Sequence, residues 1–357
     1  MKVINLKRYT MKRIIGILIF PLLLTYTNSC TDVLGDGMYT IVWEGSEVPQ
    51  DSCYRNPVWD PDLSFPTVFK AAVGYYAFGA DNEWSPGMEI TTPALSSTDL
   101  MNWRLRGSCF NAKPDWSEEK VTALSAGFAK TKGMYYIFYA LGNEGIGMGA
   151  SKAPQGPFTD FGLLINADSV GLFECNNPFF FTFGSKAYIY FQGGDGMYGH
   201  ELLLSKTELA TLNGDLFKVA GGSISSINMT KLGDYYYMFG GIDAGVGSKI
   251  TLGRADNAKG PFLDKNGDSL LDGDGTTLLQ SMEDNVFSEV KHVGGVFEDS
   301  NEDIWIVYQA TNMNMPLLTS GSERHPLMLT KIDFDNDGWP LKVFEAKSGW
   351  NHPKFAK

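Results

Sequence analysis

An aromatic strand pattern that recurs five times constrains this chain more than any other feature. Each copy is short and rich in Tyr, Phe or Trp, which is typical of a buried β-strand. The copies lie at residues 75–79, 135–139, 188–191, 236–240 and 305–308. With Tyr76, Tyr136, Tyr188, Tyr237 and Trp305 taken as equivalent positions, successive copies lie 60, 52, 49 and 68 residues apart. These periods are typical of propeller blades.

A second, shorter strand pattern follows each aromatic copy and carries small and polar residues. These segments are residues 93–97, 147–151, 202–205, 251–254 and 327–331. Two of them lead into the same Gly-Pro-Phe turn, at residues 156–158 and 260–262. Because each repeat is too small to bury its own face, five stacked repeats predict an all-β, five-bladed β-propeller. A two-sheet sandwich is the alternative, but it would not require the five blocks to be alike.

The first 29 residues have the composition of a targeting signal. They contain five basic side chains and no acidic one, followed by an apolar run at residues 14–24, which is shorter than the roughly 20 residues of a membrane span. This pattern predicts a secretory signal peptide. Cys30 directly follows it and predicts a lipid-anchored protein of the cell envelope, whereas ordinary cleavage would release a soluble secreted protein. We therefore expect a signal at 1–29, a linker at 30–50 and one propeller domain at 51–357.

The charge balance excludes polyanionic partners. The formal net charge is -12, with 41 acidic and 29 basic residues, and removal of the five basic residues of the signal leaves about -17. Nucleic-acid binding needs a basic face, so we expect no such partner. Cys53, Cys109 and Cys175 could form at most one disulfide, and no Cys-x-x-Cys spacing indicates a zinc site. We expect neither a metal nor a cofactor.

Between residues 56 and 345 the chain resembles glycoside hydrolase family 43, whose five-bladed propellers act on arabinan, xylan and related plant glycans. The pieces that carry the resemblance are short and keep the family's order. They are Asn56-Pro57-Val58, Pro66-Thr67-Val68, Ser97-Thr98-Asp99-Leu100 with Trp103, the two Gly-Pro-Phe turns, and Asp337-Gly338-Trp339-Pro340. The resemblance implies a polysaccharide or oligosaccharide as the partner.

The resemblance also locates three positions at which the family carries catalytic carboxylates. Here they align with Phe65, Asn177 and Ser225. Phe cannot act as a base, Asn has no charge with which to shift a neighbour's pKa, and a Ser hydroxyl does not protonate a leaving group near neutral pH. The resemblance therefore implies that hydrolysis by the family's mechanism is lost.

Three readings of the function remain open. The leading one is a carbohydrate-active protein that acts on or binds arabinose- or xylose-containing polysaccharide, with hydrolysis in doubt. The second is an active arabinosidase or xylosidase that uses displaced carboxylates, and the third is a non-catalytic interaction propeller. The displaced carboxylates would be Asp60, Asp62 and Glu174. The candidate sugar contacts are Phe65, Trp59, Trp84, Trp116, Asn177, Ser225 and His292.

Overall fold

The computed structural model describes residues 40–43, 46–280, 286–343 and 349–357. The predicted signal peptide, Cys30 and part of the predicted linker lie outside these ranges. The chain divides into two compact units, residues 1–54 with 350–354 and residues 55–349 with 355–357. Within the described ranges, no helix is both long enough and apolar enough to cross a membrane.

In the smaller unit, the described residues form a hairpin of β1 (Thr40–Trp43) with β2 (Ser46–Pro49), followed by the short helix η1 (Gln50–Ser52). Two further short strands, β3 (Tyr54–Asn56) and β25 (Gly349–Asn351), contain residues of both units.

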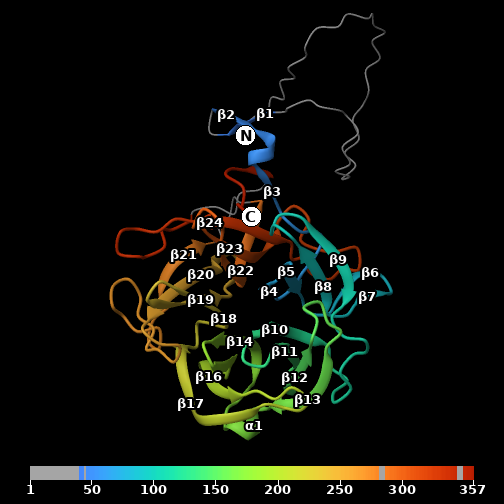
Figure 1. The fold of residues 1–357 in the computed structure, drawn as a ribbon. Helices are drawn as coiled ribbons and strands as arrows, with labels where there is room; N and C mark the ends of the chain where they lie inside the picture. Colours follow the sequence, from blue (N-terminus) through green and yellow to red (C-terminus); the bar gives the residue numbers. More distant parts are fainter. Residues whose placement is uncertain (1–39, 44–45, 281–285, 344–348) are drawn as a thin grey trace, which may run out of the picture. The chain divides into compact units, whose positions relative to one another are not determined.

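The larger unit is a ring of five antiparallel sheets, the blades of a propeller (Figure 1). Blade I comprises β4 (Thr67–Ala71), β5 (Gly74–Phe78), β8 (Pro93–Ser97) and β9 (Trp103–Ser108). Blade II comprises β10 (Val121–Ala129), β11 (Met134–Leu141), β12 (Gly145–Ser151) and β13 (Thr159–Ile165). Blade III comprises β14 (Asn176–Phe183), β15 (Lys186–Gln192), β16 (Gly196–Leu203) and β17 (Thr211–Gly221).

The remaining blades complete the ring. Blade IV comprises β18 (Ser226–Leu232), β19 (Tyr235–Ile242), β20 (Lys249–Ala255) and β21 (Thr276–Gln280). Blade V comprises β22 (Phe287–Glu298), β23 (Ile304–Asn312) and β24 (Leu327–Ile332). Outside the blades lie the hairpin β6 (Asn82–Ser85) with β7 (Met88–Ile90), helix α1 (Ala167–Val170) and helix η2 (Gly245–Gly247). The predicted all-β, five-bladed propeller is confirmed.

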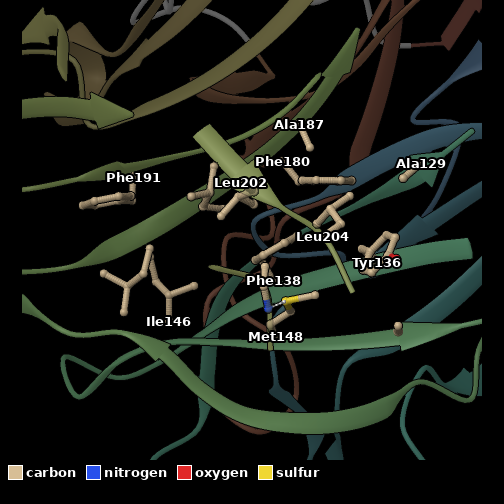
Figure 2. Close-up of a cluster of buried hydrophobic side chains, with 14 of the residues drawn as sticks. Ala129, Tyr136, Phe138, Ile146, Met148, Phe180, Ala187, Phe191, Leu202 and Leu204 are labelled. Atoms are coloured by element: carbon tan, nitrogen blue, oxygen red, sulfur yellow. Dashed lines mark hydrogen bonds between the residues drawn. The ribbon is translucent and has the colours of Figure 1, made fainter. Parts of the chain in front are cut away.

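The five aromatic repeats are the second strands of the blades, and the shorter segments are the third strands. Aromatic rings of the second strands fill the space between neighbouring blades, as Figure 2 shows for blades II and III. There Phe138 of β11 and Phe180 of β14 lie 4.9 Å apart between ring centroids. Full burial of one such side chain stabilises the fold by about 1.5–3 kcal/mol. This packing explains why a single repeat could not fold alone.

The ring closes through the segment that precedes blade I. The backbone N–H of Val58 donates to the Leu327 carbonyl at 2.9 Å, and the Leu327 N–H donates to the Trp59 carbonyl at 2.9 Å. The side chain of Asn56, which is buried, donates to the Leu329 carbonyl at 2.7 Å and accepts from the Leu329 N–H at 3.0 Å. The early segment thus takes the position next to β24 that a fourth strand would occupy in blade V.

Candidate functional site

The five innermost strands, one from each blade, surround a small axial cavity of ≈ 30 Å³. Its lining includes Phe65, Ser125, Asn177, Asn228 and His292. We call the end of the axis at which these strands begin the mouth; Phe65, Asn177, Ser225, Glu289 and the loop 313–326 lie there. A cavity of this size holds water-sized molecules. It is too small to enclose a ring of five or six atoms.

Phe65 and His292 form one wall of the axial cavity. Their ring centroids are 4.1 Å apart, and the Phe65 N–H donates to Gln309 Oε1 at 2.8 Å. Phe65 has a φ of 48°, a left-handed conformation that is uncommon for a bulky residue. Burial, together with the positive charge of Lys291, lowers the pKa of His292 to about 3. His292 is consequently neutral near pH 7 and cannot serve as a general acid there.

Asn177 and Ser225 lie side by side at the mouth. The amide nitrogen of Asn177 donates to the Ser225 carbonyl at 2.8 Å and to Gln192 Oε1 at 2.9 Å, while the Ser225 hydroxyl donates to the Gly241 carbonyl at 3.3 Å. A backbone carbonyl can only accept, so this contact requires a donor at residue 177. A carboxylate there would face an oxygen. Asn is therefore the residue that fits this environment.

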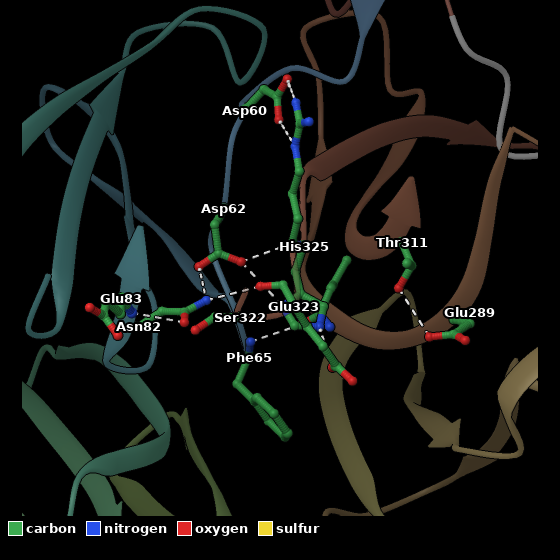
Figure 3. Close-up of polar contacts among 12 residues, drawn as sticks. Asp60, Asp62, Phe65, Asn82, Glu83, Glu289, Thr311, Ser322, Glu323 and His325 are labelled. Carbon is green, nitrogen blue, oxygen red and sulfur yellow. Dashed lines mark hydrogen bonds and ion pairs between the residues drawn. The ribbon is translucent and has the colours of Figure 1, made fainter. Parts of the chain in front are cut away.

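Asp60 and Asp62 hold the ring closed (Figure 3). Asp60 pairs with the guanidinium of Arg324 through two hydrogen bonds. Asp62 is fully buried and accepts from the backbone N–H of His325 at 2.9 Å, from its Nδ1 at 3.1 Å and from Asn82 Nδ2 at 3.0 Å. Both carboxylates thus connect the segment before blade I to the loop 313–326.

The other predicted residues separate into two places. Trp59 and Trp84 are close, with ring centroids 6.4 Å apart, and both are half-buried near the mouth. Trp116 lies against blade II instead, where its Nε1 donates to the Tyr139 hydroxyl at 2.8 Å. Glu174 is half-buried in the segment just before β14. The structure therefore brings together only two of the three predicted Trp side chains.

Two carboxylates at the mouth were missed by the sequence reasoning. Lys291 Nζ lies 3.0 Å from Asp243 Oδ2 and 3.9 Å from Glu289 Oε2, so these two oxygens are at most about 6.9 Å apart. Thr311 Oγ1 donates to Glu289 Oε2 at 3.1 Å. Burial would raise the pKa of Asp243, but the Lys291 ammonium outweighs it and lowers that pKa.

Glu289 has a φ of 50°, close to the 48° of Phe65 and the 46° of Asn177. All three residues lie at or just before the start of an innermost strand, in blades V, I and III. At Phe65 and Glu289 no sequence signal predicts this conformation, because it is expected of Gly or Asn rather than of Phe or Glu. Within the part of the chain that the structure describes, no three His, Cys, Asp or Glu side chains are grouped to hold a metal ion.

Several known proteins share this sequence pattern and fold. The sequence profile of glycosyl hydrolases family 43 matches residues 54–340. The extracellular endo-α-(1→5)-L-arabinanase 1 of Bacillus subtilis (strain 168) is 28% identical over 240 residues, which cover 60% of this chain and 72% of that protein.

Two solved structures superpose on this one. Bacteroides ovatus xyloglucan PUL GH43B gives a TM-score of 0.64 at 20% identity, and the match covers 85% of this chain and 59% of that chain. A Cellvibrio cellulosa α-L-arabinanase complexed with arabinohexaose gives 0.61 at 19% identity, over 80% of this chain and 99% of that one. At these identities the likeness concerns the fold.

Proposed function

Because the chain belongs to glycosyl hydrolases family 43, we propose that it binds arabinose-containing polysaccharide at the mouth of its propeller and does not hydrolyse it with Phe65, Asn177 and Ser225. The observation that supports the absence of hydrolysis is the hydrogen bond from Asn177 Nδ2 to the Ser225 carbonyl. It supports a site adapted to an amide, in which two of the aligned positions hold each other.

The choice of ligand rests on the relatives and on the aromatic side chains at the mouth. The Bacillus subtilis relative is named as an arabinanase, and the Cellvibrio structure holds arabinohexaose. Sugar rings present C–H groups that pack on aromatic faces. Phe65 offers such a face at the axial cavity, and the neighbouring Trp59 and Trp84 offer theirs beside the loop 313–326. These contacts support recognition of a neutral glycan over recognition of a protein partner.

Calorimetry with α-1,5-linked arabino-oligosaccharides tests the proposal. We expect binding by the wild-type protein, at least tenfold weaker binding by Trp84→Ala, and unchanged binding by Trp116→Phe, which keeps the ring on blade II. Arabinan, aryl arabinosides and aryl xylosides should not be turned over. Absence of binding to arabinan, xylan and their oligomers would contradict the carbohydrate reading.

Hydrolysis by displaced carboxylates is the second candidate, and the placement of Asp243 and Glu289 favours it. Glycosidases use two carboxyl groups roughly 5–9.5 Å apart, and these two oxygens lie within about 6.9 Å. The lowered pKa of Asp243 keeps it ionised, as a nucleophile or base must be, and Glu289 is the remaining carboxyl group for the acid role. Turnover that is lost in both Asp243→Asn and Glu289→Gln, with binding retained, would establish this candidate.

We also propose that the protein is exported and anchored by a lipid on Cys30. The basic and apolar segments before Cys30 support it, and the relative from Bacillus subtilis is named as extracellular. Metabolic labelling with a fatty acid should mark the wild-type protein in the membrane fraction. The Cys30→Ala variant should carry no label, and equal labelling of both would contradict the anchor.

A further inference from the structure

A second cavity, of ≈ 100 Å³, lies on blade I away from the axis. We call it the side cavity; Asp81, Thr92, Ser108, Phe110, Asn111 and Lys113 are among its lining residues. None of these residues lines the axial cavity. The side cavity is more than three times as large as the axial one and is comparable with the order of 150 Å³ in which a protein interior holds a single benzene ring.

The inner wall of the side cavity is held by a rigid polar network. Both carboxylate oxygens of Asp81 accept backbone N–H groups, from Thr92 at 2.8 Å and from Val121 at 3.0 Å. Burial raises the pKa of Asp81, although these two donors oppose the rise. The Asp81 carboxylate joins the hairpin β6–β7 side of blade I to the start of β10. Each oxygen retains further acceptor capacity toward the cavity.

Thr92 contributes a strained backbone to the same wall. Its φ is 37°, which is an outlier for a β-branched residue and costs on the order of 1–3 kcal/mol. Three contacts hold it: its N–H donates to Asp81, its carbonyl accepts from the Cys109 N–H at 3.0 Å, and its hydroxyl lies 2.8 Å from the Ser108 hydroxyl. The wall is therefore fixed before any ligand arrives.

The outer rim combines polar and apolar groups from the segment between β9 and β10. Asn111 and Lys113 are exposed, whereas Phe110 and Pro114 are buried and supply apolar surface. Lys113 Nζ donates to the Glu118 carbonyl at 2.7 Å, and the Lys113 charge acts to lower the pKa of Asp81. The side cavity thus offers hydroxyls, an amide, one negative and one positive charge, and an aromatic ring. Such groups recognise a neutral polyhydroxylated ligand.

We propose that the side cavity is a second carbohydrate site that takes a single pentose residue of a neutral polysaccharide. The inference rests on the proposed function, because it assumes that the chain binds an arabinose-containing glycan. The volume admits one furanose or pyranose ring and no second sugar, so the site would hold a chain end or a branch. A glycan that occupies the mouth and the side cavity together gains affinity from the second contact.

Titration calorimetry with arabinotriose tests the inference with three variants. Ala112→Trp places a large side chain at the exposed rim of the side cavity and touches none of the hydrogen bonds above. Ala72→Trp, in the exposed turn after β4, is the matched control, and Trp84→Ala disturbs the mouth. We expect the wild type and Ala72→Trp to bind two equivalents of arabinotriose. Ala112→Trp should bind one, at the mouth, and Trp84→Ala should bind one, in the side cavity.

The outcomes separate this inference from the proposed function. If Ala112→Trp binds as many equivalents as the wild type, the side cavity is not a site. If the wild type binds one equivalent that Ala112→Trp loses and Trp84→Ala keeps, the mouth proposal fails and the side cavity stands. Absence of binding by the wild type overturns both. Should Ala112→Trp not fold, Asn111→Ala is used, with at least tenfold weaker binding of the same class expected.

Discussion

Removal of the Asp62 carboxylate should open the ring at its closure and destabilise the whole propeller. The side chain is fully buried and accepts three hydrogen bonds, at 2.9, 3.0 and 3.1 Å, from His325 and Asn82. Removing the carboxylate leaves three donors without their acceptor, each at a cost of about 1–3 kcal/mol, so the total is on the order of 3 kcal/mol or more. We expect Asp62→Ala to lose that amount, and Asp62→Asn, which keeps one acceptor oxygen, to lose about 1–3 kcal/mol.

Asp60→Ala is the matched control for this experiment. Asp60 pairs with Arg324, but its side chain is 37% exposed, and exposed pairs contribute about 0–1 kcal/mol. Urea denaturation followed by tryptophan fluorescence measures both variants under the same conditions. A loss below about 1 kcal/mol in Asp62→Ala, or lost glycan turnover at unchanged stability, would refute the structural role and return Asp62 to the list of catalytic candidates.

Three further predictions concern the axis. Folding lowers the pKa of His292 to about 3 from an unfolded value of about 6.5. The unfolded state therefore binds a proton more readily, and acidification below pH 6.5 destabilises the folded state. In denaturation experiments between pH 7 and 4, the wild type should lose about 3 kcal/mol of stability relative to His292→Gln. Asn177→Asp should lose about 1–3 kcal/mol by facing the Ser225 carbonyl, without gaining arabinosidase activity. Gly241→Ala should lose more than about 3 kcal/mol in thermal unfolding, because the added methyl overlaps the Lys291 carbonyl oxygen.

The fold was predictable because its signal is repeated and local. The aromatic segments alternate with small-residue segments at blade-like periods, and a strand needs only its own residues and its neighbours to be recognised. The closure of the ring has no such signal. Val58 and Leu327 are joined by backbone hydrogen bonds, which any residue type can make, so their pairing leaves no mark on the composition of either segment.

The site was predictable only in part, and for a related reason. Phe65, Asn177 and His292 could be located because short motifs around them fix their places in the blades, and all three line the axial cavity. Asp243 and Glu289 could not, because their proximity depends on the way Lys291 crosses between blades IV and V. Asp62 has the sequence context of a surface turn, and its burial depends on contacts with Asn82 and the distant His325.

The closure of the ring sets the order in which the chain can be completed during synthesis. Blades II, III and IV are built from contiguous residues. Asn56, in contrast, forms its hydrogen bond with Leu329 only after a further 273 residues have been synthesised. At about 5–20 residues per second, the interval is roughly 14–55 s. The segment 56–62 is therefore among the first parts of the propeller to emerge and among the last to form its native hydrogen bonds. A protease that cuts this segment in a nascent chain would remove the contacts that close the ring, even though every blade remained intact.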